Sequence, residues 1–375
     1  MPYWRLSSFY LFYFASLGAL LPYWALYLDS LGFAPAAIGE LMAALMATKI
    51  VAPNLWGWIA DHTGRHMPVV RLASLVSMIA FAGVLLGDSY PWLMLVMLVF
   101  SFFWNASLPQ LETTTLRHLG DHTHRYSIVR LWGSVGFILT VAVLGEVLEW
   151  SGPDMVPLVV LSLMAGIWLA SLWVPAADGP DLSLEHTPIT RTLRRPQVLG
   201  LLVVCFLMQA SHGPYYTFYT IYLGEHHYSS GTIGQLWALG VIAEVGVFLV
   251  MHRLVPLFGL RGLLLGSLLL TVIRWLLIGW FVDMPAVVVA AQLLHAASFG
   301  VYHATAIQLI YGFFSGRQQG RGQALYSSMS FGAGGAVGSL YSGYLWVSAG
   351  PAWTYGIAAI LAVLAWLVAW RWIRV

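Results

Sequence analysis

The chain alternates long apolar runs with short polar breaks. About 20 apolar residues are needed to cross a bilayer as a helix, and breaks at proline, glycine and clustered charges divide the chain into twelve such runs. The predicted helices fall near residues 4–29, 36–60, 67–87, 91–118, 126–149, 154–174, 197–223, 230–255, 261–282, 285–314, 320–347 and 352–372. Long helices satisfy their own backbone polar groups in lipid. The pattern therefore predicts an all-α polytopic membrane protein with twelve transmembrane helices.

Composition supports this class. Hydrophobic residues make up 59% of the chain and charged residues 9%, whereas soluble domains average about 25% charged residues. The net charge of +2 is small and the arginines are scattered among short connections, which excludes a nucleic-acid-binding patch. The single cysteine, Cys205, forms no internal disulfide. No small-residue cleavage site follows the first apolar run, so we expect a retained anchor rather than a signal peptide.

The longest polar stretch, residues 175–195, separates two sets of six predicted helices. It predicts a linker between bundles at 1–174 and 196–375. Arginines occupy alternate connections, the C-terminal end and, through Arg5, the N-terminal end, while the opposite connections carry only acidic charges. Because basic loops stay on the cytoplasmic side, both termini and the linker are expected to be cytoplasmic, in a multi-pass protein of a bacterial inner membrane.

The two halves repeat. Residues 38–41 (IGEL) and 233–236 (IGQL) begin corresponding helices, and the same sequence offset relates Lys49 to Glu244. Two charges of opposite sign would then occupy equivalent positions in the two halves. Later in the chain, Gly334 and Gly338 form a small-residue pair, which predicts close packing between the halves rather than a ligand-binding loop.

Several full charges lie inside predicted helices. Glu244 is the only acidic residue of the run 231–254, and a carboxylate at the centre of a spanning helix costs on the order of 3 kcal/mol. Lys49, Glu112 and Arg274 are candidates for similar depth, and Arg130 lies near the start of another helix. Such costly residues are candidates for a functional site.

Other polar side chains extend this set. Asn105 and Glu112 are seven residues apart and share a helix face, and Arg130 follows across a short connection, where it can pair with Glu112 or lie at a rim. His295 and His303 lie in one predicted helix, where proton relay and a structural hydrogen bond are both open. Lys49 is a candidate for proton coupling or a non-titrating salt bridge.

A polar and aromatic face is expected in the helix at 197–223, where Gln209, His212 and Tyr216 recur at helical spacing. Together with Tyr13, these rings can stack on an aromatic substrate while an arginine holds its carboxylate. Tyrosine and tryptophan are also enriched at membrane interfaces without binding anything.

The connection after the second helix, residues 57–66 (GWIADHTGRH), resembles the G-x-L-A-D-R-x-G-R-K signature of the major facilitator superfamily. The matching positions include Gly57, Asp61, Gly64 and Arg65. The resemblance implies two pseudo-symmetric six-helix bundles with the substrate site between them, and a loop that stabilises one state of alternating access. An ordinary charged turn is the alternative.

The charged set is similar to the pattern of oligosaccharide-proton symporters of the lactose permease type. That resemblance implies that Glu112 and Arg130 are on the substrate side, that Glu244 links substrate to coupling, and that Arg274 and His295 belong to the proton side. Ser298 stands where those symporters have a proton-accepting glutamate.

The chain is also similar to the phenylpropionate permease family. The similarity rests on VRLWGSVGF (129–137), QASHGPYYTFYTIYL (209–223), TIGQLWALGVIAEV (232–245), VIRW (272–275) and QLLHAASF (292–299). It implies a proton-linked importer of aromatic carboxylates such as 3-phenylpropionate.

The sequence as a whole thus predicts a secondary active transporter working by proton symport and alternating access. A proton symporter of a neutral sugar or nucleoside is the alternative, and a non-transporting membrane receptor is the other class. An enzyme is not expected, because hydrolase, zinc-protease and phosphate-loop motifs are lacking. The expected partners are the substrate, protons and membrane lipid, with no cofactor, metal or nucleic acid, and the protein is expected to act as a monomer.

Overall fold

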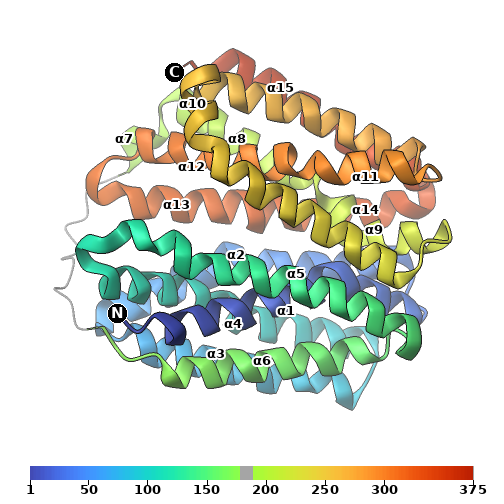
Figure 1. Cartoon of the computed structure of the whole chain (residues 1–375), viewed down its shortest axis with the longest axis horizontal. Helices are drawn as coiled ribbons and strands as arrows, with labels where there is room; N and C mark the ends of the chain where they lie inside the picture. Colours follow the sequence, from blue (N-terminus) through green and yellow to red (C-terminus); the bar gives the residue numbers. More distant parts are fainter. Residues whose placement is uncertain (178–188, 375) are drawn as a thin grey trace. The chain divides into compact units, whose positions relative to one another are not determined.

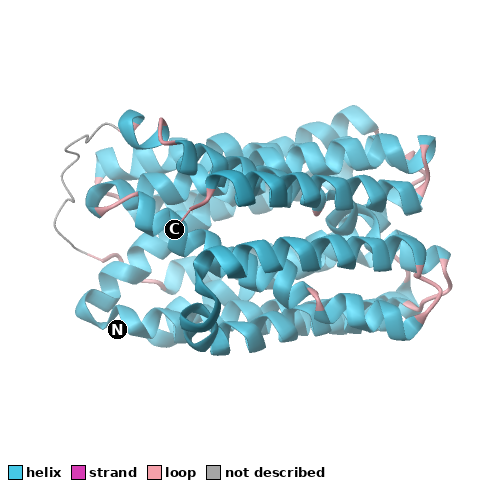
Figure 2. Cartoon of the chain, turned by 90° about the horizontal axis from the view of Figure 1, so that it is seen from above, coloured by secondary structure: helices cyan, strands magenta, loops and turns pink. Residues whose placement is uncertain are grey.

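The computed structural model describes residues 1–177 and 189–374, and every regular element in them is helical (Figures 1 and 2). The elements of the first half are α1 (Tyr3–Ser30), α2 (Pro35–Thr63), α3 (His66–Ala82), η1 (Gly83–Leu86), α4 (Tyr90–Leu119), η2 (Gly120–Arg125), α5 (Tyr126–Ser151) and α6 (Met155–Trp173). Those of the second half are α7 (Thr190–Leu193), α8 (Pro196–Ser211), α9 (Gly213–Glu225), α10 (Ser230–Trp280), α11 (Pro285–Leu293), η3 (Ala296–Val301), α12 (Tyr302–Phe313), η4 (Gly316–Gln318), α13 (Gln319–Ser327), η5 (Ser328–Gly334), α14 (Gly335–Ser348) and α15 (Pro351–Trp372).

The helices confirm the predicted membrane architecture. Ten helical segments of the described chain are long and apolar enough to cross a bilayer. One of them, α10, has 51 residues and turns at Gly259, whose φ of 66° lies in the left-handed region, so it supplies two spans. The continuous run α13–η5–α14 supplies one more. Twelve spans result, as the sequence predicted.

The chain divides into two compact units. Unit 1 contains Met1–Phe33, Ala47–Leu184 and Ser229–Gln235, and unit 2 contains Ala34–Met46, Glu185–Tyr228 and Leu236–Val375. The start of α2 thus belongs to unit 2 and the start of α10 to unit 1. The boundaries expected at 1–174 and 196–375 stay a prediction, and most of the linker expected at 175–195 lies outside the described residues.

Within unit 1, α1 packs directly on α5. A Cβ added at Gly136 would lie 2.2 Å from the carbonyl oxygen of Leu11, and one at Gly18 would lie 2.9 Å from the carbonyl oxygen of Phe137. Only glycine allows two helix backbones to come this close, and close approach is how helices gain packing energy in lipid. The arrangement fixes α1 and α5, which carry Tyr13 and Arg130.

Unit 2 has its own apolar core around α8, α12 and α15, which includes Cys205. Here the sequence interpretation of the small-residue pair is corrected. A Cβ at Gly334 would lie 2.6 Å from the carbonyl oxygen of Phe206, and one at Gly338 would lie 2.7 Å from that of Ala210. The glycines do serve packing, but they pack on α8 of the same unit rather than between the halves.

The repeated sequence at the starts of α2 and α10 has equivalent surroundings in the two units. In unit 2, a Cβ at Gly39 would lie 2.8 Å from Cα of Gly343, and in unit 1 a Cβ at Gly234 would lie 3.2 Å from Cα of Gly145. Each repeat therefore places a glycine against a glycine of a neighbouring helix. This correspondence supports the offset that relates Lys49 to Glu244.

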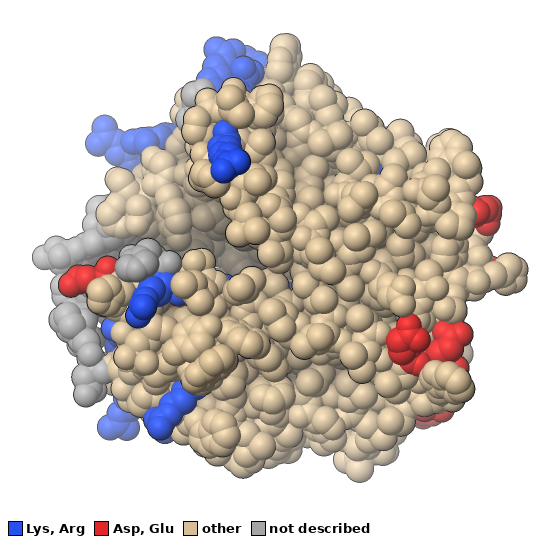
Figure 3. Space-filling model, in the orientation of Figure 1, with Lys and Arg blue, Asp and Glu red and all other residues tan. Residues whose placement is uncertain are grey.

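Charged side chains avoid most of the visible surface. On the face in Figure 3, arginines gather toward one end of the helices and carboxylates lie mainly toward the other, with one carboxylate patch also at the arginine end, and the broad band between the ends shows almost no charge. An uncharged band is what the hydrocarbon core of a bilayer requires. The full charges inside the helices are therefore exceptions to the pattern of the surface.

Candidate functional site

The centre of unit 2 contains a carboxylate and an imidazole in contact. Nε2 of His295 lies 3.5 Å from Oε2 of Glu244, with the two side chains 6% and 15% exposed. His295 comes directly before η3, a π-helical turn, and Glu244 lies on α10. Two glycines make room: a Cβ at Gly240 would lie 3.4 Å from His295, and one at Gly300 would lie 3.2 Å from Glu244. The two predicted coupling residues are thus brought together.

Arg274 is fully buried beside this pair. Its guanidinium donates from Nε to the carbonyl oxygen of Ala291 at 3.0 Å, and from Nη1 to Oγ of Ser298 at 2.9 Å. It also lies over the rings of Tyr215 and Trp275, 4.2 and 4.7 Å from their centroids. Ser298, at the position where the symporter pattern has a glutamate, thus serves as a neutral acceptor for the arginine.

The predicted polar face of the seventh span lies at a helix break. His212 separates α8 from α9 and its ring stacks on Tyr216, with centroids 5.7 Å apart. Nδ1 of His212 lies 2.8 Å from the carbonyl oxygen of Met208, which assigns the proton to Nδ1. Nε2 of His212 and Oε1 of Gln209 are buried and have no hydrogen-bond partner among the described residues. These atoms are acceptors in need of a donor.

His303 occupies a separate position. Its Nδ1 lies 2.8 Å from the hydroxyl of Tyr326. The ring of Phe299 lies between the two histidines, with its centroid 5.5 Å from that of His295 and 5.6 Å from that of His303. Because a phenyl ring carries no exchangeable proton, the direct step between the histidines is blocked at this point.

In unit 1, Glu112 and Arg130 form the pair that the sequence suggested. Nε of Arg130 lies 3.8 Å from Oε1 of Glu112, and both side chains are about three-tenths exposed, at 31% and 28%. The hydroxyl of Tyr126 donates to the same carboxylate oxygen at 3.1 Å. The guanidinium lies 3.8 Å from the ring centroid of Phe14. Tyr126, which sequence reasoning missed, was visible as the residue one helical turn before Arg130.

Tyr13, Asn105 and Lys49 lie around Trp104 and the facing turn of α2 in unit 1. The ring of Tyr13 stacks on Trp104 with centroids 4.8 Å apart and planes 9° apart. Nζ of Lys49 lies 5.9 Å from the centroid of Trp104. Asn105 donates from Nδ2 to the hydroxyl of Thr48 at 2.9 Å, which ties α4 to the turn of α2 that carries Lys49. Trp104 was missed because a buried tryptophan has no distinctive sequence spacing.

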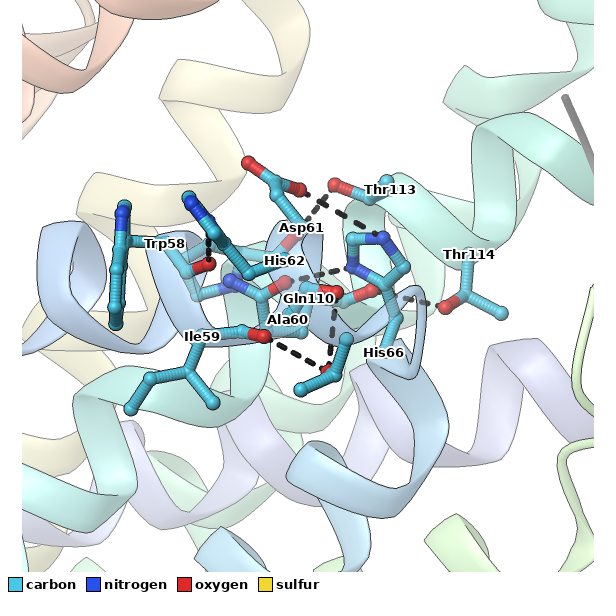
Figure 4. Close-up of polar contacts among 11 residues, drawn as sticks. Trp58, Ile59, Ala60, Asp61, His62, His66, Gln110, Thr113 and Thr114 are labelled. Carbon is cyan, nitrogen blue, oxygen red and sulfur yellow. Dashed lines mark hydrogen bonds and ion pairs between the residues drawn. The ribbon is translucent and has the colours of Figure 1, made fainter. Parts of the chain in front are cut away.

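The signature loop between α2 and α3 forms a compact polar cluster (Figure 4). Nδ1 of His66 lies 2.8 Å from Oε1 of Gln110 on α4, and Nε2 lies 3.8 Å from Oδ1 of Asp61. Gly64 has a φ of 66°, so the turn needs glycine there. Gly57 approaches Gln110, since a Cβ added to it would lie 3.5 Å from Nε2. Arg65 is exposed. The loop therefore connects three helices of unit 1.

Twelve spans in two repeated halves, with ionisable side chains inside them, define a membrane transporter of the major facilitator class. The chain belongs to the MFS_1 like family, whose model matches residues 3–357.

Similar proteins agree with this class. The chain is 29% identical over 360 residues to a probable 3-phenylpropionic acid transporter of Escherichia coli K12, covering 95% of this chain and 93% of that protein. It is 28% identical over 376 residues to a maltose permease of Geobacillus stearothermophilus, covering 96% and 92%. A variant of the nucleoside transporter NupG has the same fold, with a TM-score of 0.88, 16% identity and complete coverage of both chains. A D-xylose-proton symporter matches with a TM-score of 0.79, 14% identity and coverage of 98% and 96%.

Proposed function

We propose that this transporter couples proton entry to the uptake of a small aromatic carboxylate by alternating access. The observation that carries the proposal is the contact between Glu244 and His295, two titratable side chains 3.5 Å apart within membrane-spanning helices. An ionised carboxylate in a spanning helix costs on the order of 3 kcal/mol. Protonation of Glu244 removes that charge before the site passes through a state closed to both sides.

The residues around this pair have separate roles in the proposed proton coupling. In the proposed cycle Glu244 receives a proton from outside, and His295 is the neutral partner that shares or accepts it. Arg274, held by Ser298 and Ala291 at 2.9 and 3.0 Å, keeps a fixed positive charge near the pair. We also propose His303, which contacts Tyr326 and is separated from His295 by Phe299, as a coupling residue that does not exchange its proton directly with His295.

The proposed substrate is an aromatic carboxylate such as 3-phenylpropionate. A carboxylate anion and a proton together carry no net charge, so their joint movement spares the site an uncompensated charge. The substrate-side residues that we propose are Tyr13, Asn105, Glu112, Arg130, Gln209, His212 and Tyr216. Support comes from the stacked rings at Tyr13 and His212 and from the relative named for 3-phenylpropionic acid.

The test uses purified protein in sealed vesicles suspended in weak buffer. Addition of 3-phenylpropionate is expected to make the outside more alkaline, and an uncoupler is expected to abolish the change. Maltose and a nucleoside serve as comparison solutes, and vesicles without protein are the control. Uptake of radiolabelled 3-phenylpropionate with no proton movement would refute the coupling, and no uptake of that acid would refute the substrate.

Proton symport of a neutral sugar or nucleoside is the second candidate. It is favoured by the 28% identity to a maltose permease across nearly the whole chain. In the vesicle assay this candidate predicts alkalinisation with the sugar or the nucleoside and none with the aromatic acid.

We also propose that both termini and the arginine-rich connections lie in the cytoplasm of a bacterial cell, with the protein in the inner membrane as a monomer. The signature loop with Gly57, Asp61, Gly64 and Arg65 would then stabilise one state of the cycle from the cytoplasmic side. Thiol labels placed at exposed loop positions and applied from one side of intact cells would test this orientation. Labelling of the loop at Arg65→Cys from outside would contradict it.

A further inference from the structure

Lys49 is the only lysine among the 375 residues, whereas the other sixteen basic residues are arginines. Most of the arginines supply the charges of the connections and of the chain ends, and Arg130 and Arg274 lie inside helices. The one lysine instead lies in α2, within a segment apolar enough to span a membrane. Lysine presents a compact ammonium with three donors on a flexible stem, which differs from the rigid planar fork of arginine.

Three cations within the described spans, Arg274, Arg130 and Lys49, differ in what surrounds them. Arg274 is fully buried and is held by neutral acceptors and two rings. Arg130 faces the carboxylate of Glu112 at 3.8 Å. Lys49 is half-buried and has no hydrogen bond or ion pair with any residue that the structure describes. A cation inside a membrane protein normally has an anionic or polar partner. Of these three cations, Lys49 is the one that lacks such a partner among the described residues and can bind an anion.

A second donor without a partner lies beside it. Trp104 is 2% exposed, and its indole Nε1 is buried with no hydrogen-bond partner among the described residues. Nζ of Lys49 lies 5.9 Å from the centroid of this indole. A buried donor left without an acceptor is unfavourable, because its hydrogen bond to water is lost and not replaced. A carboxylate has two oxygens and can accept from an ammonium and an indole N–H together.

The same place offers an aromatic surface. Tyr13 is stacked on Trp104, and the two rings are nearly parallel at 9°. The chain of hydrogen bonds from Asn105 to Thr48 and from Thr48 to Ser101, each 2.9 Å, holds α2 against α4 at this level. These hydrogen bonds therefore hold the turn of α2 that carries Lys49 next to the part of α4 that carries Trp104.

We propose that Lys49 binds the carboxylate of the transported anion, with the Trp104 indole N–H as the second donor and the Tyr13 and Trp104 rings beside the substrate's ring. The sequence pattern grouped Lys49 with the proton-coupling residues, but its surroundings favour substrate binding. This inference rests on the proposed uptake of an aromatic carboxylate and names the residue that selects for the charge.

The variants Lys49→Arg and Lys49→Gln test the inference in vesicles, with 3-phenylpropionate compared with its neutral amide. Measuring solute exchange as well as uphill uptake separates substrate binding from proton coupling. Lys49→Gln is expected to raise KM for exchange of the acid at least about tenfold, because hydrogen bonds to charged groups are among the strongest, and to leave the amide little changed. Lys49→Arg is expected to restore part of the affinity. Trp104→Phe is expected to weaken binding of the acid, whereas Trp56→Phe, which removes another unpartnered indole N–H of the same unit, is the matched control.

Unmodified protein gives an independent measurement that does not depend on a variant folding. An amine-reactive ester can label the side chain of Lys49, the only lysine of the sequence, and the protein's N-terminal α-amino group. Mass spectrometry of the peptides is expected to show that 3-phenylpropionate slows labelling at Lys49 and leaves labelling of the N-terminal amino group unchanged.

The outcomes separate this inference from the function it rests on. If the wild-type protein transports the acid but Lys49→Gln keeps its exchange KM, or labelling of Lys49 is not slowed, the assignment of Lys49 is overturned and the proposed transport stands. Loss of uphill uptake in Lys49→Gln with an unchanged exchange KM likewise overturns it, because that result marks a coupling residue. If the wild-type protein does not transport the acid at all, both proposals fall.

Discussion

Arg274 lies at the centre of unit 2, and Arg274→Lys is the change that tests its structural role most sharply. The substitution keeps the positive charge and shortens the reach of the donors. Arginine here spans two acceptors on different sides, the carbonyl oxygen of Ala291 and the hydroxyl of Ser298, and lies over the rings of Tyr215 and Trp275. A single ammonium cannot reproduce this geometry.

The magnitude follows from what the lysine loses. We expect it to keep one of the two short hydrogen bonds and to forfeit the other, at about 1.5 to 3 kcal/mol for a bond to a charged group. Weaker contact with the two rings adds about 1 kcal/mol. The variant is therefore expected to be about 3 kcal/mol less stable, which corresponds to a rise of about a hundredfold in the population of opened molecules.

The chain contains its own reporter for this measurement. Cys205 is the only cysteine and is fully buried in the apolar core of unit 2. A thiol-reactive fluorophore therefore labels the protein in detergent only when that core opens. When reclosing is faster than labelling, the labelling rate follows the population of the open state. Arg274→Lys is expected to accelerate labelling of Cys205 by about a hundredfold.

Arg71→Lys is the matched control, because Arg71 is half-buried and donates to the carbonyl oxygens of Val174 and Ser171 at 2.9 and 3.3 Å in unit 1. In Arg71→Lys, the rate of Cys205 labelling should change by less than about fivefold, since only the longer hydrogen bond, to Ser171, is lost. Equal labelling rates for Arg274→Lys and the wild-type protein would refute the view that the guanidinium organises the core of unit 2.

Three further predictions concern unit 1. Gly136→Ala is expected to lower the stability of the folded protein by about 1 to 3 kcal/mol, because the added Cβ would lie 2.2 Å from the carbonyl oxygen of Leu11. Loss of folded protein on heating in detergent measures this effect. The control Gly246→Ala should be neutral, since nothing lies within 4 Å of its added Cβ, and equal losses for the two variants would contradict the packing argument. Tyr126→Phe removes the hydroxyl that donates to Glu112, and KM for uptake is expected to rise about three- to tenfold; an unchanged KM would remove Glu112 from the substrate side. Asp61→Asn leaves the shape of the signature loop intact but removes the carboxylate charge next to His66. The maximal transport rate should therefore fall while KM for exchange stays the same. A change confined to KM would contradict a conformational role for the loop.

The sequence predicted the twelve spans because each is long, apolar and bounded by charges or by glycine and proline. Spacing along a helix also predicted the contact between His212 and Tyr216, since residues four apart share a face. The pairing of Glu112 with Arg130 was one of two open alternatives, and the structure decides for it at 3.8 Å. The internal offset also relates Lys49 to Glu244, and the equivalence of these two positions stays a prediction.

Other features depend on which helices meet, and no spacing within one helix gives that. The glycines Gly334 and Gly338 indicated close packing but not the partner, which is α8. Trp104 and Gln292 carry buried donors that have no hydrogen-bond partner in the described part of the chain. A tryptophan or glutamine inside an apolar run looks the same in the sequence whether or not its donor has a partner. The surroundings of Lys49 could therefore not be predicted from its position alone.

The measurement that tests the account most directly compares uphill uptake and solute exchange of 3-phenylpropionate in vesicles bearing Glu244→Gln. The account predicts that exchange persists while uphill uptake and the accompanying alkalinisation are lost. The reason is that the amide of Gln keeps the shape of the site but cannot take up and release a proton. Glu149→Gln, which changes an exposed carboxylate at the far end of α5, should retain both activities. Undiminished uphill uptake by Glu244→Gln would contradict the central claim that this carboxylate carries the proton.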